Sequence, residues 1–245
     1  MSCLLPCANL VGRWQHRLLA WSLGSFAFMV SQVDYCTQPI SATESNVVIA
    51  DQIWSKTNLA LVLFANGDTI QQASSEAEWH YCVANMIPAW CDANNDITSV
   101  SVYGLLCNYF AATDKRGLAP RGWKVADAHD WCKLLWNLDS MKAHGIARSL
   151  QSKSGWDHNG IDKYGYAAKP SGAMSSNGGC CGKGTYCAWW NLGGDAASAC
   201  NTELYYRVWG QELIELDGAI NVGYVYDWRT TGPSVRCVKN ESKVE

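Results

Sequence analysis

Tryptophan and glycine constrain the fold of this chain more than any other feature of its sequence. Thirteen tryptophans, 11 tyrosines and 21 glycines occur among its 245 residues. Large aromatic rings favour burial, and glycines permit the tight and left-handed backbone conformations of irregular loops. The combination predicts a loop-rich fold in which aromatic side chains hold an irregular backbone in place.

The overall composition is that of a globular protein. Hydrophobic residues make up 48% of the chain and charged residues 17%, which permits a sizeable core and argues against a disordered chain. The 19 Lys and Arg residues against 22 Asp and Glu give a formal net charge of -3. Nucleic-acid-binding domains usually carry an excess of positive charge, so we expect no nucleic-acid partner.

Twelve cysteines are more than an ordinary cytosolic enzyme of this length carries. No two of them have the Cys-x-x-Cys spacing, which disfavours a zinc ribbon or a thioredoxin-type motif. We therefore expect disulfides among some of them and an oxidising compartment.

A short apolar segment near the N-terminus has the layout of an export signal. Residues 18–30 (LLAWSLGSFAFMV) are uncharged and follow Arg13, His16 and Arg17. The run is shorter than the roughly 20 apolar residues that a membrane-spanning helix needs, and a buried or anchoring amphipathic helix is the alternative. These features predict a secreted or cell-surface protein with no transmembrane span beyond a signal or anchor. The expected organisation is a signal or anchoring segment at 1–34, a polar linker at 35–46, a folded domain at 47–240 and a polar tail at 241–245.

Local patterns predict three helices in the first two thirds of the chain. Ser75 to Glu78 form a capping box, and Trp79 and Cys82 supply the apolar stripe of the helix that follows. The second helix is capped by Asp127, and its apolar face consists of Trp131, Leu134, Leu135 and Leu138. A third helix is expected over residues 142–150.

Short apolar runs predict strands on both sides of these helices. Residues 47–49 and 61–64 form the first two, and Asn66-Gly67-Asp68 is a turn signal after the second. Three or four more are expected near the C-terminus, around 205–209, 213–216, 224–228 and 234–238. Helices that precede most of the strands, with irregular connections between them, indicate an α+β domain.

Common catalytic motifs are absent from the sequence. It contains neither Gly-x-Ser-x-Gly nor His-Glu-x-x-His. The glycine-rich segment 177–184 (NGGCCGKG) lacks the first Gly and the final Ser or Thr of a phosphate-binding loop, and we interpret it as a flexible turn. An enzyme remains an alternative, because a hydrolase could use a cysteine or a pair of the carboxylates Glu212, Glu215, Asp217 and Asp227.

Asp157, Asn159 and Asp162 form a weak candidate calcium site. Calcium prefers several carboxylate and carbonyl oxygens on one loop. Asp and Asn side chains at such spacing more often form Asx turns that shape the loop itself. We favour the turns, and expect no metal or other cofactor.

An ordered series of fragments extends over roughly residues 47–240. In this order the fragments resemble the Fibrobacter succinogenes major paralogous domain, a family with a C-type-lectin-like fold. They are Trp54-x-x-x-Asn58-Leu59, Pro88-Ala89-Trp90-Cys91, Tyr103-Gly104-x-x-x-Asn108-Tyr109, Gly117-Leu118-Ala119-Pro120-Arg121-Gly122-Trp123, Asp130-Trp131-x-x-Leu134, Gly155-Trp156, Tyr164-Gly165-Tyr166, Pro170-x-Gly172, Trp189-Trp190 and Ser234-Val235-Arg236-Cys237-Val238.

The resemblance implies two or more short helices packed on a small antiparallel sheet with long irregular loops. A disulfide between the first helix and the last strand is common in such domains, and here it would join Cys132 to Cys237. The Glu-Pro-Asn and Trp-Asn-Asp motifs of calcium-dependent lectins are absent, because Trp190-Asn191 continues into Leu192. Calcium-mediated sugar binding is therefore not implied.

Function is expected on the C-terminal loops and strands, where residue types typical of recognition surfaces concentrate. About half of the aromatic side chains there must face the core, because strand side chains alternate between faces. The predicted ligand-binding residues are Tyr186, Asn191, Tyr205, Tyr206, Arg207, Trp209, Tyr224, Tyr226, Asp227, Trp228 and Arg229.

The stretch from Trp189 to Trp228 also resembles the region that retroelements diversify in some C-type-lectin-like proteins. Scattered Tyr, Trp, Asp, Arg, Ser and Gly precede a Val-Arg-Cys-like end in both. The resulting hypothesis is a non-enzymatic protein that recognises a protein or glycan ligand on a cell surface. A hydrolase-type enzyme and a purely structural surface protein are the alternatives.

Overall fold

The computed structural model describes residues 46–93, 96–138, 146–158, 160–175, 178–192, 210–214 and 230–240. The chain divides into two compact units, Met1–Asp34 and Tyr35–Glu245, and all of the described residues belong to the second. Among these residues, no helix combines the length and the apolar character that crossing a membrane requires. The predicted segments at 1–34 and 241–245 lie outside the described residues, and so does most of the predicted linker.

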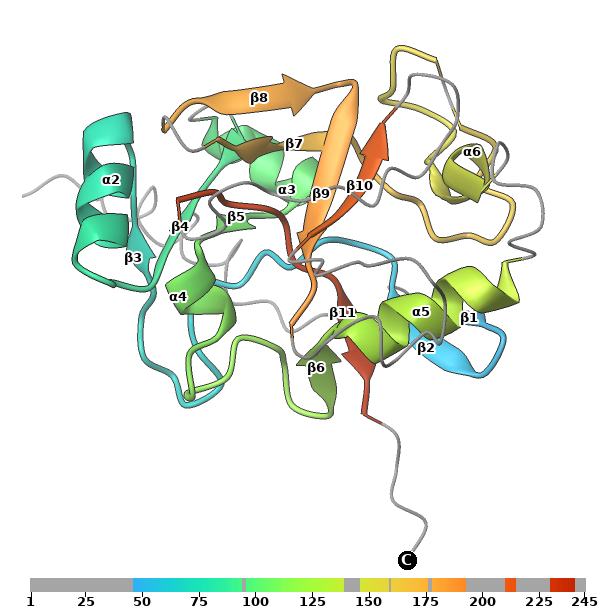
Figure 1. Ribbon diagram of the computed structural model, residues 1–245, viewed down its shortest axis with the longest axis horizontal. Coiled ribbons are helices and arrows are strands. Elements are labelled where there is room, and N and C mark those ends of the chain that lie inside the picture. The colour runs from blue at the N-terminus through green and yellow to red at the C-terminus, as the bar shows by residue number, and fades with distance from the viewer. Residues whose placement is uncertain are drawn as a thin grey trace, which may run out of the picture. The chain divides into compact units, whose positions relative to one another are not determined.

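The described part of the domain is an α+β structure with short elements (Figure 1), which confirms the predicted fold class. Its helices are α2 (Glu76–Ala84), the 3-10 helix η2 (Ile97–Ser99), α3 (Val100–Tyr103), α4 (Tyr109–Ala112), α5 (Ala128–Asn137) and α6 (Ile146–Leu150). Its strands are β1 (Asn46–Ile49), β2 (Gln52–Ser55), β3 (Gln71–Gln72), β4 (Ala89–Cys91), β5 (Leu106–Cys107), β6 (Trp123–Val125), β7 (Ser171–Met174), β8 (Cys180–Lys183), β9 (Tyr186–Trp190), β10 (Gly210–Ile214) and β11 (Cys237–Lys239).

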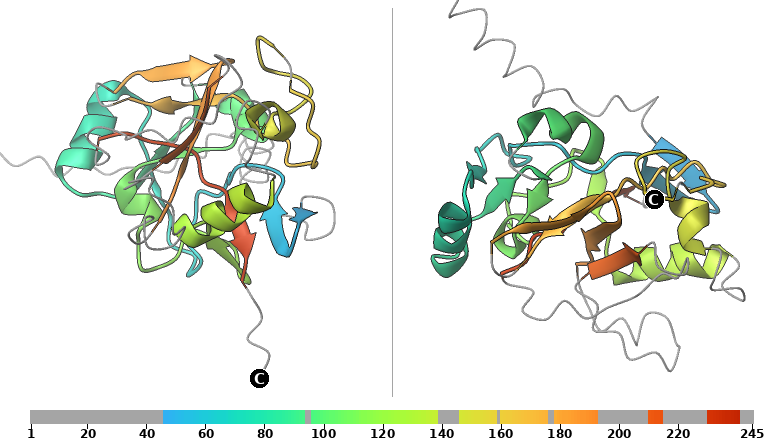
Figure 2. Two further views of the ribbon diagram at one scale, coloured as in Figure 1. Left: turned by 45° about the vertical axis from the view of Figure 1, so that its right-hand side comes forward. Right: turned by 90° about the horizontal axis from the view of Figure 1, so that it is seen from above.

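The strands form three small sheets. Their orders are β1-β2-β11-β6, β10-β9-β7-β8 and β3-β4-β5. Ser234 makes isolated bridges to Leu106 and to Trp189, so the segment before β11 links β5 to β9. The views in Figure 2 place α2 and α5 at opposite ends of this arrangement.

Two of the three predicted helices begin at their predicted caps. Ser75 accepts a hydrogen bond from the Glu78 backbone N–H at the start of α2, and Trp79 and Cys82 are buried. The Glu78 carboxylate accepts from the Ser74 N–H, one residue before the cap. Helix α5 has a complete capping box, in which Asp127 and Asp130 each accept from the other's backbone N–H. Helix α6 forms only from Ile146 onward, and the rest of its predicted span lies outside the described residues.

The strand predictions hold less well. Strand β1 is present where 47–49 was expected, but the run 61–64 forms only one isolated bridge, Leu63 to Thr69. The Phe64 N–H donates to the Asp68 carbonyl and the Ile70 N–H to the Val62 carbonyl, so the run pairs across the turn at Asn66-Gly67-Asp68 through single hydrogen bonds without forming a strand. Near the C-terminus, β10 covers part of 213–216 and β11 part of 234–238.

The glycine-rich segment was predicted as a flexible turn, and this is wrong for its second half. Residues 180–183 form β8, which pairs antiparallel with β7. Gly172 on β7 makes this pairing possible: its φ is +68°, and a Cβ atom there would collide with the Cys181 carbonyl oxygen.

Three apolar clusters form the core, and β9 supplies two of them with consecutive residues. Trp189 packs with Trp54, Trp131 and Tyr166 beneath α5, whereas Trp190 packs with Trp90, Cys107 and Cys237 near α4. Successive strand side chains point to opposite faces, so this tryptophan pair lies in two clusters at once. The third cluster lies beneath α2, around Trp79, Cys91 and Met174.

Buried indoles hold the irregular backbone as the sequence predicted. Seven of the nine tryptophans in the described residues are buried. Five of the seven donate a hydrogen bond to a backbone or side-chain oxygen: Trp79 to the Thr230 carbonyl, Trp90 to that of Ile70, Trp156 to that of Ala168, Trp190 to that of Cys107 and Trp189 to Asn58 Oδ1.

Candidate functional site

Only two of the predicted ligand-binding residues, Tyr186 and Asn191, lie in the described structure. Tyr186 is half-buried at the first position of β9. Asn191 follows the last position of β9 and is only 2% exposed, so its side chain lies in the interior. The other predicted ligand-binding residues lie outside the described residues: Tyr205, Tyr206, Arg207, Trp209, Tyr224, Tyr226, Asp227, Trp228 and Arg229.

A rigid strand pair carries the first of the two segments that contain these residues. Strands β9 and β10 are antiparallel, with Trp190 opposite Gly210 and Tyr186 opposite Ile214. The segment 193–209 therefore leaves and re-enters the sheet at the same end of this pair. Its start is fixed further by the Leu192 N–H, which donates to the Ala126 carbonyl at 3.3 Å.

Helix α2 fixes the end of the second segment, 215–229. Trp79 Nε1 donates to the Thr230 carbonyl at 2.9 Å. Two residues later, Gly232 and Met174 exchange backbone hydrogen bonds, both 2.9 Å long. A Cβ atom at Gly232 would lie 2.5 Å from the Trp79 ring, so this position packs directly against the indole. Both candidate segments are thus attached to the core at described residues.

A buried guanidinium lies at the centre of the same core. Arg236 has no exposed surface, and its Nε donates to Asn58 Oδ1 at 2.8 Å. Its other nitrogens donate to the backbone carbonyls of Ser55, Tyr166 and Ala167. The guanidinium also lies over the Tyr166 ring, 4.4 Å from the centroid. Burial lowers the pKa of Arg236, and neutral acceptors and aromatic faces compensate for its lost hydration.

Asn58 connects this cation to two other parts of the chain. Its Oδ1 accepts from both Arg236 and Trp189, and its Nδ2 donates to the Tyr103 carbonyl. Gly104 lies directly against it, with a φ of +73° and no room for a side chain. Four of the fragments that carry the family resemblance therefore meet here, and their role is to build the frame.

The role of Arg236 was not predicted from the sequence. An arginine inside a mostly apolar run, between Val235 and Cys237, is a signal for a buried cation. Its acceptors cannot be found from the sequence, because they lie 69 or more residues away along the chain.

One cluster among the described residues could hold a metal ion by its geometry: Asp127, His129 and Asp130 at the start of α5. Lys124 Nζ already lies 2.7 Å from Asp127 Oδ2 and 2.8 Å from Asp130 Oδ2. Burial opposes the charge on Lys124, but hydrogen bonds to the two carboxylates outweigh it and raise the lysine pKa. Burial raises the pKa of Asp130. We assign this cluster to the cap of α5 and its counter-ion.

Of the three calcium candidates, Asp162 has a described contact within its loop. Its carboxylate accepts a hydrogen bond from the Ala167 backbone N–H at 2.8 Å, and the residue has a φ of +45°. This bond reaches five residues along the chain, whereas an Asx turn reaches two, so the Asx turns stay a prediction. Asp157 is exposed, and Asn159 lies outside the described residues.

The described residues do not include the side chains of the carboxylates that the enzyme hypothesis requires. Glu212 is placed on β10 by its backbone alone. Glu215, Asp217 and Asp227 lie outside the described residues.

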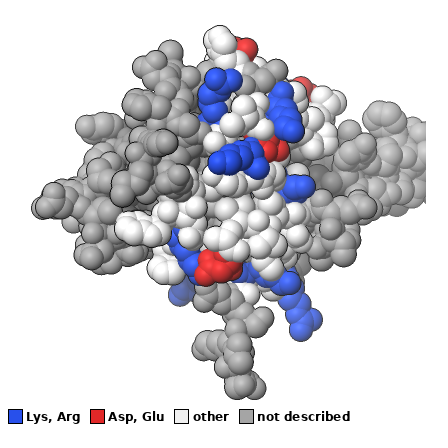
Figure 3. All heavy atoms as spheres, turned by 90° about the vertical axis from the view of Figure 1, so that its right-hand side faces the viewer, with Lys and Arg blue, Asp and Glu red and all other residues white. Residues whose placement is uncertain are grey.

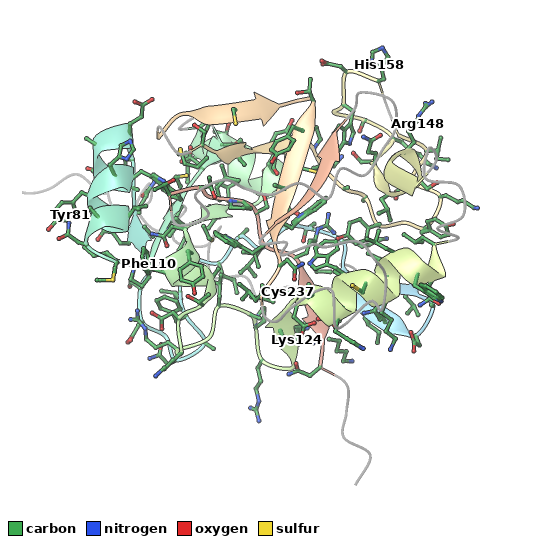
Figure 4. All side chains as sticks on the ribbon, in the orientation of Figure 1. Tyr81, Phe110, Lys124, Arg148, His158 and Cys237 are labelled. Atoms are coloured by element: carbon green, nitrogen blue, oxygen red, sulfur yellow. The ribbon has the colours of Figure 1, made fainter. Side chains whose placement is uncertain are left out.

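The predicted disulfide between Cys132 and Cys237 is wrong. Cys237 is a buried free thiol (Figure 4), and burial raises its pKa to about 12. Helix α5 packs on the face of β11 that carries Val238, in the cluster with Trp131 and Leu134. Cys237 points to the opposite face and packs with Trp190. Strand alternation therefore turns this thiol away from the helix that carries Cys132.

Charges of both signs are spread over the described surface. On the face shown in Figure 3, Lys and Arg side chains are interleaved with acidic and uncharged ones. A further, partly exposed group of charges combines Arg116 with Asp68 and Asp114.

The family model described as the Fibrobacter succinogenes major domain matches residues 47–239. The chain belongs to this family. The match covers most of the chain and includes every fragment on which the resemblance rested. No curated protein and no solved structure matches the chain.

Proposed function

We propose that this member of the Fibrobacter succinogenes major domain family is a non-enzymatic ligand-binding protein. Its binding face would be formed by the two segments that flank β10, residues 193–209 and 215–229. One observation carries the proposal: the family fragments are used in the core, and the segments that carry the predicted aromatic and arginine residues are attached to that core at their ends. Variable recognition loops on a rigid scaffold are a common basis of binding proteins.

The composition of the two segments supports a protein or glycan ligand. Tyrosine and tryptophan provide large contact areas with little conformational freedom to lose, and arginine adds charged hydrogen bonds. We further propose a C-type-lectin-like architecture, diversification of the segments by a retroelement, and display outside the cytoplasm. The basic residues before the apolar segment 18–30 support export.

Alanine substitutions test the assigned face once glycan and protein arrays have identified a ligand. Tyr206→Ala and Tyr226→Ala are expected to weaken binding by about tenfold or more each, the size typical of an aromatic hot-spot residue. Their melting temperatures should stay within a few degrees of the wild type.

Tyr81→Ala is the matched control. Tyr81 is 63% exposed on α2, outside both segments, so its loss should change neither binding nor melting. Undiminished binding in both Tyr206→Ala and Tyr226→Ala would exclude the assigned face. Substrate turnover that is lost in Glu212→Ala or Asp227→Ala would favour the enzyme alternative instead.

A further inference from the structure

Cys91 and Cys180 come together from two different sheets. Cys91 is the last residue of β4, in the sheet β3-β4-β5, and is fully buried beneath α2. Cys180 is the first residue of β8, the edge strand of the sheet β10-β9-β7-β8. Cys180 is half-buried and packs against the apolar cluster that contains Cys91.

The two sulfur atoms are direct neighbours. Both cysteines are thiols in this structure, and their side chains are hydrogen-bonded to each other. The Cys180 thiol also lies 3.7 Å from the carbonyl oxygen of Asp92, the residue that follows Cys91. The contact between the two cysteines and the contact of Cys180 with the Asp92 backbone both place the start of β8 against the end of β4.

Neighbouring cysteines do not share this geometry. Cys181 is the next residue on β8, is exposed, and donates to the Ala173 carbonyl on β7. Its side chain points to the other face of the strand, as alternation requires. Cys107 and Cys237 are each about 1% exposed in the core near α4, where a dissolved oxidant has no access.

We propose that Cys91 and Cys180 form a disulfide that joins β4 to β8 when the protein is in an oxidising compartment. The oxidant is a low-molecular-weight disulfide such as oxidised glutathione. The half-buried Cys180 loses its proton to water and its thiolate attacks one sulfur of the oxidant, which releases one thiolate and leaves a mixed disulfide. The Cys91 sulfur then attacks Cys180 and displaces the second thiolate, which takes up the Cys91 proton.

The order of these steps follows from accessibility. The hydrogen bond to Cys180 and burial both raise the pKa of Cys91 well above its usual range, and a thiol in that state is a poor first nucleophile. Cys180 can meet a dissolved reagent, whereas Cys91 needs only to reach the adjacent sulfur. The cross-link closes a long loop, so it should stabilise the folded protein.

Peptide mapping of the full chain tests the bridge directly. The protein is incubated in a glutathione redox buffer, quenched in acid, unfolded, alkylated with N-ethylmaleimide and digested without reduction. The expected product is a peptide pair joined through Cys91 and Cys180, with Cys107 and Cys237 carrying the maleimide. Maleimide on both Cys91 and Cys180, glutathione retained on Cys180, or a bridge from Cys180 to Cys181 would each overturn the proposal.

Two serine variants separate the bridge from general thiol chemistry. Oxidation should raise the urea midpoint of the wild type and of Cys181→Ser by more than that of Cys180→Ser, in which only other bridges, such as the one that holds Cys132, can form. An oxidation-dependent shift in Cys180→Ser as large as that of the wild type would contradict the assignment. This outcome is independent of the ligand-binding proposal, which concerns other residues and is measured on arrays.

Discussion

At the scale of single residues, Arg236 has the most demanding environment in the described structure. Its hydrogen-bond acceptors within the described residues are all neutral: the Asn58 side chain and the carbonyls of Ser55, Tyr166 and Ala167. A buried cation without a carboxylate depends on the number and placement of such acceptors. The planar guanidinium can serve several of them at once in fixed directions, and a lysine ammonium cannot.

Arg236→Lys should therefore lower the free energy of unfolding by about 2–4 kcal/mol, because several buried acceptors lose their donor. Urea unfolding followed by tryptophan fluorescence measures the change. Arg121→Lys is the matched control, since Arg121 is exposed and such a substitution should cost no more than about 0.5 kcal/mol. Equal unfolding midpoints for the two variants would show that the guanidinium geometry is unimportant.

At the scale of elements, Gly104 determines how the end of α3 meets the segment after β2. Its φ is +73°, and a Cβ atom there would lie 2.6 Å from Asn58 Cβ and 2.9 Å from the Leu59 carbonyl oxygen. Gly67, in the turn before β3, has a similar φ of +92° but nothing within 4 Å of a Cβ position. Both glycines have a positive φ, and of the two Gly104 alone is packed against other atoms at the Cβ position.

Gly67→Ala should cost about 1–2 kcal/mol, the strain of a left-handed alanine. Gly104→Ala should cost a further 1–3 kcal/mol or so, because the collision involves backbone that cannot rotate away. Chemical denaturation of the two variants measures the difference. A Gly104→Ala protein as stable as Gly67→Ala would mean that the contact with Asn58 relaxes without cost.

The elements that were predicted correctly are those specified by residues close to one another in the sequence. The caps of α2 and α5 depend on residues three apart, and both helices begin at Ser75 and Asp127 as expected. Strand β8 depends on a close approach between Gly172 and Cys181 that no local pattern contains. The predicted bridge from Cys132 to Cys237 failed for a similar reason, since the face of β11 that carries Cys237 is decided by packing across the sheet.

At the scale of the whole molecule, the core and the candidate binding segments divide the C-terminal region between them. Trp189 and Trp190 are each 1% exposed and Asn191 is 2% exposed, although all three lie within the stretch that resembles a diversified region. Beyond Thr230, the segment from Thr231 to Val238 is buried throughout. Within the stretch from Trp189 to Val238, we therefore expect variation only between these two buried ends.

Sequencing of the 3′ end of the gene across one source population tests this division. If a retroelement diversifies the protein, substitutions should accumulate at adenine-containing codons between Gly193 and Trp228. Trp189 and Trp190 should stay fixed, because replacing a buried tryptophan costs about 3–5 kcal/mol, a large fraction of the stability of a single domain. Substitutions that are as frequent at these two tryptophans as at Tyr206 or Tyr226 would contradict the division into core and binding segments. A uniform sequence would exclude diversification and leave a dedicated binder, for which one ligand should account for the binding seen on arrays.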